Sequence, residues 1–192
     1  MSVRNLDKLF NPEFVALIGA SPRPGSVGAV IARNLRRAGF AGELMFVNPN
    51  HPTIDGFTVH PNITSLPRAP DLAVIATPAE TVPSLIGELG ERGTRAAAVI
   101  ITAGFAELGE RGHSLQQAIL DAAKPYLLRI IGPNCVGIMV PRVGLDATFS
   151  HLAAPAGDIA FISPALFFDL SKYLWTERWV AKPDRYIDAA IP

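Results

Sequence analysis

Five short, mostly apolar runs divide the first two thirds of the chain, and segments with a different hydrophobic spacing lie between them. Each run ends in Gly, Pro, Thr or Asn, which is typical of buried strands. The expected strands are residues 14–18, 43–47, 71–76, 96–101 and 127–131.

Three intervening segments repeat apolar residues at helical spacing, which predicts amphipathic helices from about 26 to 38, 80 to 92 and 112 to 123. Gly39 and Gly93 are plausible helix ends. The residues expected on the buried faces are Val27, Val30, Ile31, Leu35 and Ala38, then Val82, Leu85, Ile86 and Leu89, then Leu115, Ala118, Ile119 and Ala122.

Two segments fall outside this alternation. Residues 1–13 form a lead-in whose Leu6, Leu9 and Phe10 are expected to dock on the domain. Residues 51–70 are rich in Pro, Asn and Thr and are interpreted as a surface connection, with an extended piece at 57–60 and a short helix near 63–66.

Strands that alternate with helices, and that are apolar throughout, predict an α/β fold. We expect a Rossmann-like parallel sheet with helices on both faces. In such sheets the carboxyl ends of the strands share one edge, where ligands bind near the topological switch point. The five loops that follow the strands therefore predict the binding edge.

Composition narrows the class of partner. The 192 residues carry 17 basic and 17 acidic side chains, which gives no general electrostatic case for nucleic acid or an anionic membrane. No apolar run reaches the roughly 20 residues of a membrane helix, and Met1 to Lys8 does not resemble a secretory signal. A single cysteine fits a reducing compartment, so we expect a cytoplasmic location.

The chemistry begins at residues 14–28, where a strand, a glycine-rich loop and a helix follow one another. This order places backbone N–H groups and a helix N-terminus where a phosphate can sit. A plain tight turn is the alternative. The spacing Gly19, Gly25, Gly28 differs from the dinucleotide fingerprint, and the second strand ends in Asn48-Pro49-Asn50 without the carboxylate of an NAD site.

Several motifs occur in order and together resemble one family. They are Val15–Ser21 with Pro24–Gly28, Val47–Pro49, Asp71–Ala79, Ile101–Glu107, Ile131–Gly137, Asp146–Phe149 and Gly157–Ser163. The chain resembles the N-terminal CoA-binding domain of NDP-forming acyl-CoA synthetases, the group that includes ADP-forming acetyl-CoA synthetase and the succinyl-CoA synthetase α subunit.

The resemblance implies that the glycine loop holds the phosphate of coenzyme A, that Val47 and Pro49 surround the adenine, and that the later loops follow the pantetheine to its thiol. Arg23 is either a phosphate contact or a solvated loop charge. The implied cofactor-binding residues are Gly19, Ser21, Arg23, Gly25, Ser26, Val47, Asn48, Pro49, Asn50, Thr77, Pro78, Thr102, Gly104, Phe105, Glu107, Asn134 and Cys135.

The chain also departs from the family. A lysine often follows the Val-x-Pro turn, but Asn50 and His51 stand here, which puts the reading of the 3′-phosphate in doubt. Cys135 has no visible base and is expected to pack near the thiol rather than to react. None of the four histidines, His151 included, resembles the phosphohistidine of the family. We expect neither a catalytic residue nor a metal site.

These features predict a CoA-binding domain at residues 1–157, followed by the start of a second domain at 158–192 that diverges after Ser163 into a tail holding both Trp residues. A helix at about 166–175 is one interpretation of this tail. The leading hypothesis is the CoA-binding part of an ADP-forming acyl-CoA synthetase, with CoA or acyl-CoA as ligand and an ATP-grasp β subunit or the missing ligase domains as partner. A stand-alone CoA-binding regulatory module and an NAD(P)-binding module are the alternatives.

Overall fold

The computed structural model describes residues 5–94 and 96–157. The start of a second domain expected at 158–192 and the helix expected at about 166–175 lie outside these residues.

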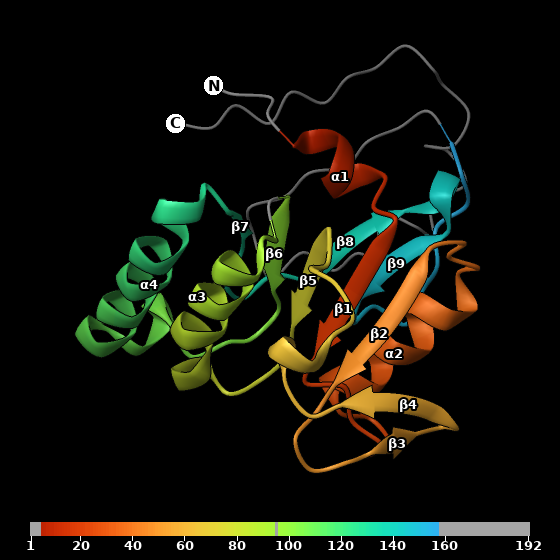
Figure 1. Ribbon diagram of the computed structural model, residues 1–192, viewed down its shortest axis with the longest axis horizontal. Coiled ribbons are helices and arrows are strands. Elements are labelled where there is room, and N and C mark those ends of the chain that lie inside the picture. Colours follow the sequence, from red (N-terminus) through yellow and green to blue (C-terminus); the bar gives the residue numbers. More distant parts are fainter. Residues whose placement is uncertain (1–4, 95, 158–192) are drawn as a thin grey trace.

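The centre of the molecule is a seven-stranded sheet in the order β3-β4-β2-β1-β5-β6-β7 (Figure 1). All neighbours pair in parallel except β3 and β4. The strands are β1 Phe14–Ile18, β2 Glu43–Val47, β3 Thr53–Ile54, β4 Phe57–His60, β5 Leu72–Ile75, β6 Ala97–Ile100 and β7 Arg129–Ile131. The five expected strands are therefore present within two residues of their expected limits.

The order of the strands reverses direction at β1. The chain passes from β1 through α2 (Val27–Arg37) to β2 on one side, whereas β5, α3 (Val82–Arg92), β6, α4 (Glu110–Ala123) and β7 lead away on the other. The topological switch point of the sheet therefore lies between β1 and β5, beside the glycine loop.

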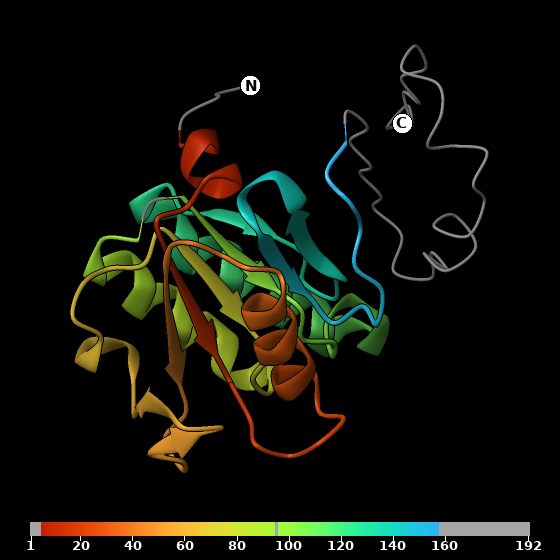
Figure 2. The same cartoon turned by 90° about the vertical axis from the view of Figure 1, so that its right-hand side faces the viewer.

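Different elements cover the two faces of the sheet. Helices α3 and α4 pack on one face around Ile86, Leu89 and Ile119. On the other face, α2 packs through Ile31 and Leu35 beside an antiparallel hairpin of β8 (Gly137–Val140) and β9 (Leu145–Thr148) (Figure 2). Helices therefore cover both faces of the sheet, as expected, and the hairpin adds to the face that α2 covers.

The sequence pattern did not reveal this hairpin because its strands are short and are separated by Pro141 and Gly144. The turn is placed by close packing. A Cβ at Gly144 would lie 2.6 Å from the carbonyl oxygen of Gly39, just beyond the end of α2. The backbone of the hairpin therefore approaches the end of α2 as only glycine permits.

Helix α1 (Leu6–Phe10) is the expected lead-in, and Leu9 is buried whereas Phe10 is 48% exposed. Val27 and Ala38 are also exposed, so the buried face of α2 is narrower than its apolar pattern predicted. Val27 is apolar, but as the first residue of α2 it is 43% exposed.

The connections contain short 3-10 turns. These are η1 Ile63–Ser65, η2 Ala79–Thr81, η3 Ala106–Leu108, η4 Lys124–Tyr126 and η5 Pro141–Val143. The short helix expected near 63–66 is η1. Across the described ranges 5–94 and 96–157, no helix combines the length and the apolar character that crossing a membrane requires.

Candidate functional site

The glycine loop brings the start of α2 against the end of β1. Gly19 has a φ of +93°, and a Cβ on Gly28 would lie 2.0 Å from the carbonyl oxygen of Gly19. Ser26 caps the helix, since its Oγ accepts the Ala29 N–H at 3.3 Å. The two glycines thus let α2 begin directly above the carboxyl edge of the sheet.

The first turn of α2 can receive an anion. Within the part of the chain that the structure describes, the N–H groups of Val27 and Gly28 have no hydrogen-bond partner, as expected at a helix N-terminus. Gly25 is exposed nearby, and the Ser21 hydroxyl accepts the Arg23 N–H at 3.1 Å. The Arg23 guanidinium is exposed and takes part in none of the ion pairs among the described residues.

The loop after β2 is tied to the loop after β1. The Gly19 N–H donates to the Val47 carbonyl at 2.9 Å, and Asn48 Nδ2 donates to the Ala20 carbonyl at 2.7 Å. Asn48 Oδ1 accepts the Asn50 N–H at 2.8 Å. Asn48 therefore positions both loops, while the exposed Pro49 and Asn50 remain open to solvent.

The loop after β5 is tied to the loop after β6. Thr102 Oγ1 donates to the Thr77 carbonyl at 2.7 Å, which links the loops after β5 and β6. Thr81 Oγ1 lies 2.9 Å from Thr77 Oγ1 and 2.7 Å from the Pro78 carbonyl. The sequence analysis missed Thr81, although a Thr four residues after Thr77, at the start of a helical turn, is the signal of such a hydroxyl contact.

Glu107 and Asn134 connect the last two loops. Glu107 Oε1 accepts the Gly104 N–H at 2.6 Å and Asn134 Nδ2 at 3.2 Å, and the Asn134 N–H donates to the Thr102 carbonyl at 2.9 Å. The hydrogen bond from Gly104 lowers the pKa of Glu107, so this exposed carboxylate is charged at neutral pH. The end of the edge near β6 and β7 is therefore polar and anionic.

Three of the expected residues turn their side chains away from solvent. Phe105 and Val47 are buried in the core beside α3, so only their backbones can contribute at the edge. The Cys135 thiol donates to the Ile100 carbonyl at 3.3 Å, and burial raises its pKa. A thiol in this state is a poor nucleophile.

Hydrogen bonds thus join the loops after β1 and β2, and likewise the loops after β5, β6 and β7, and the edge that these five loops form changes character along its length. N–H donors and Arg23 gather at the glycine loop, whereas hydroxyl, amide and carboxylate groups follow toward β7. This arrangement suits an extended ligand with phosphate at one end and an uncharged polar chain at the other. No group of three or more His, Cys, Asp or Glu suited to a metal occurs in residues 5–94 and 96–157.

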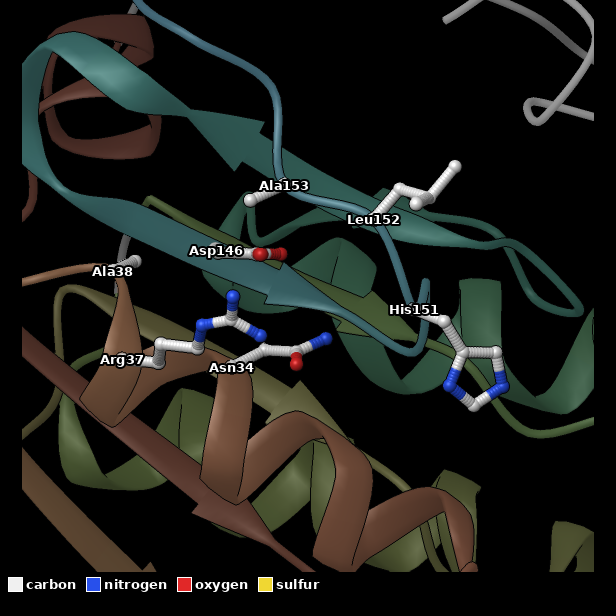
Figure 3. A pocket seen from close by; sticks show the side chains of 7 residues that line it. All are labelled: Asn34, Arg37, Ala38, Asp146, His151, Leu152 and Ala153. Atoms are coloured by element: carbon white, nitrogen blue, oxygen red, sulfur yellow. The ribbon is translucent and has the colours of Figure 1, made fainter. Parts of the chain in front are cut away.

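A separate hollow of about 80 Å³ lies beside the C-terminal half of α2, away from the glycine loop. Figure 3 shows the carboxylate of Asp146, from β9, close to the Arg37 guanidinium, with Asn34 beneath and His151 at the side. His151 is exposed. Burial raises the pKa of Asp146.

Comparison with known proteins gives the same assignment of the fold. Residues 13–141 match the family model described as "CoA binding domain". The chain is 39% identical over 173 residues to "Acetate--CoA ligase [ADP-forming] I" of Archaeoglobus fulgidus, a match that covers 90% of this chain and 25% of that protein. It is 36% identical to "Acetate--CoA ligase [ADP-forming] I subunit alpha" of Pyrococcus furiosus, over 90% of this chain and 38% of that subunit. The chain thus spans well under half the length of these relatives.

Solved structures support the same fold. A protein from Pyrococcus horikoshii superposes with a TM-score of 0.76 at 39% identity, over 81% of this chain and 35% of that chain. A second match is the dinucleotide forming acetyl-coenzyme A synthetase 1 of Ca. Korarchaeum cryptofilum, in complex with phosphate and ADP. Its TM-score is 0.69 at 36% identity, over 75% of this chain and 30% of that chain.

Proposed function

Because the chain belongs to the CoA-binding domain family, we propose that it is the CoA-binding part of an ADP-forming acyl-CoA synthetase and holds coenzyme A along the carboxyl edge of its sheet. The observation that carries this proposal is the junction of the glycine loop and α2. There, two free N–H groups and a helix N-terminus point to the switch point of the sheet.

The proposed placement follows the change of character along the edge. The pyrophosphate lies over Gly25, Ser26 and the first turn of α2, where Arg23 adds a positive charge. The adenine end lies toward Pro49 and Asn50. The pantetheine passes Thr77 and Thr102 toward Glu107 and Asn134, whose polar groups suit the two amides of that chain.

The whole reaction proposed for the assembly converts an acid, CoA and ATP into acyl-CoA, ADP and phosphate. This domain contributes the position of the CoA thiol, and the phosphoryl chemistry belongs to an ATP-grasp subunit or to further ligase domains. The names of the relatives from Archaeoglobus fulgidus and Pyrococcus furiosus support this assignment. Mixing the chain with such a partner should yield acyl-CoA.

Binding can be tested with the chain alone. CoA should raise its melting temperature, because a ligand that binds only the folded state stabilises it, and NAD should not. Dephospho-CoA measures how much the 3′-phosphate contributes. No shift with CoA in any of these assays would contradict the proposal.

The same assay shows whether Arg23 contacts the phosphate or is a solvated loop charge. Substituting Arg23→Ala should weaken CoA binding about fivefold, which corresponds to about 1 kcal/mol for an exposed charge near a phosphate. Arg142→Ala is the matched control, because Arg142 is also exposed but lies in η5, which follows the hairpin strand β8. Equal affinities for the two variants would make Arg23 a solvated loop charge.

A further inference from the structure

Asn34 is a polar residue on the buried face of α2. It is 6% exposed and stands between Ile31 and Leu35, which pack on the sheet. Its Nδ2 donates to the Thr148 carbonyl at 2.9 Å and to the Ser150 carbonyl at 2.7 Å. Both hydrogens of the amide are therefore hydrogen-bonded to backbone carbonyls at the end of β9 and just after it.

The segment after β9 holds itself together by short side-chain bonds. Thr148 Oγ1 donates to Asp146 Oδ1 at 2.7 Å, the Ser150 N–H donates to Thr148 Oγ1 at 3.3 Å, and the Leu152 N–H donates to Ser150 Oγ at 3.1 Å. Residues 151–153 and 155–157 are exposed. The Asn34 side chain thus ties α2 to this chain of hydrogen bonds, beside the hollow drawn in Figure 3.

The proposed phosphate site and Asn34 lie on the same helix, α2. Asn34 lies eight residues after the cap Ser26, a distance of about 12 Å along the axis at 1.5 Å per residue. The N-terminus of α2 is the proposed phosphate site, and Asn34 in the middle of the helix holds the backbone at the end of β9. Helix formation is cooperative, so a ligand that stabilises the first turn also favours the turns that follow it.

We propose that Asn34 couples the CoA site to residues 149–157, so that ligand at the first turn of α2 orders the segment that leaves the domain. This inference rests on the proposed function. Ligand satisfies the free N–H groups of Val27 and Gly28 and opposes fraying of α2, and the steadier helix then holds the Thr148 and Ser150 carbonyls more firmly. The coupling is reciprocal, so loosening the segment must weaken CoA binding.

The test is amide hydrogen exchange, measured on the full chain with and without saturating CoA. We expect peptides covering 149–157 to exchange about fivefold or more slowly when CoA is bound, the lower end of typical coupling between sites. Asn34→Asp keeps the shape of the side chain but cannot donate. In this variant CoA should still protect the glycine loop, but should leave 149–157 unchanged and bind about fivefold more weakly.

Arg33→Ala is the matched control. Arg33 precedes Asn34 on α2 and is exposed. Its guanidinium donates to Asn34 Oδ1, from Nε at 3.4 Å and from a terminal nitrogen at 3.3 Å, so its removal leaves both Nδ2 bonds in place. This variant should keep the protection of 149–157. If it lost that protection as N34D does, the assignment to the two Nδ2 bonds would be wrong.

The outcomes separate the two proposals. If CoA protects the glycine loop of the unaltered chain and leaves exchange at 149–157 unchanged, the coupling is refuted and the CoA site stands. If CoA does not bind at all, the proposed function fails and the coupling fails with it. Should N34D not fold, the comparison of the unaltered chain with and without CoA decides alone.

Discussion

Replacing Gly28 with alanine sets two physical effects against each other. In a helix, alanine is more favourable than glycine by roughly 0.5–1 kcal/mol, so propensity alone predicts a more stable protein. At Gly28, however, the new Cβ would lie 2.0 Å from the Gly19 carbonyl oxygen and 3.3 Å from the Ser21 nitrogen. Both are backbone atoms, which have little freedom to move.

The packing effect should win. Overpacking in a tight site typically costs about 1–3 kcal/mol, and contact with a rigid strand end places Gly28→Ala at the upper end of that range. We therefore expect the free energy of unfolding to fall by about 2 kcal/mol. The helix must also shift away from the glycine loop, which displaces the free N–H groups and should weaken CoA binding about tenfold.

Gly87→Ala is the matched control. Gly87 lies in the middle of α3, and a Cβ there meets no atom within 4 Å. This variant should gain about 0.5–1 kcal/mol by propensity and bind CoA normally. Urea denaturation followed by circular dichroism measures the free energy of unfolding of both variants. If Gly28→Ala were as stable as Gly87→Ala, the close approach of α2 to β1 would be refuted.

Four further predictions follow from the site. Asn48→Ala should lower stability by about 1–2 kcal/mol in urea denaturation, because it removes hydrogen bonds that join the loops after β1 and β2. Asn50→Lys should improve CoA binding about fivefold by calorimetry and leave dephospho-CoA unchanged, since the exposed position lacks a charge for the 3′-phosphate; equal gains for both ligands would contradict this. The thiol of Cys135 should react with iodoacetamide at least about tenfold more slowly than free cysteine, because burial raises its pKa. Burial also raises the pKa of Asp146 above its usual 3.8, so the folded state holds a proton that the unfolded chain has lost, and stability falls as pH rises through this window. The stability of Asp146→Asn relative to the original protein should therefore increase from about pH 3.5 to pH 7 in thermal melts. A stability difference that stays constant with pH would refute this assignment.

Much of the fold was accessible from the sequence because its signals are local. The limits of β1 and β2 follow from apolar runs that stop at Gly19 and Asn48, and the start of α2 follows from the cap Ser26. The hairpin β8–β9 was missed because its short strands carry neither clear alternation nor length. The expected burial of Phe10 and Val27 was wrong, since an apolar pattern does not tell how much of a helix the rest of the fold covers.

The candidate site shows the same division. The loops that carry it were identifiable because carboxyl ends of parallel strands must share an edge. The role of each side chain could not be identified from the sequence. Phe105 is a core residue, the Asn48 amide donates to the Ala20 carbonyl, and the hydroxyl of Thr81 contacts that of Thr77.

The sequence by itself determined the class of fold and predicted the edge of the sheet and the glycine junction where the ligand is proposed to bind, because strand runs, caps and glycine positions act over a few residues. Only the tertiary structure decided that Asn34 holds Thr148 and Ser150, more than a hundred positions away along the chain. Such a contact depends on how α2 and β9 are brought together by the packed sheet, and no local pattern encodes that meeting.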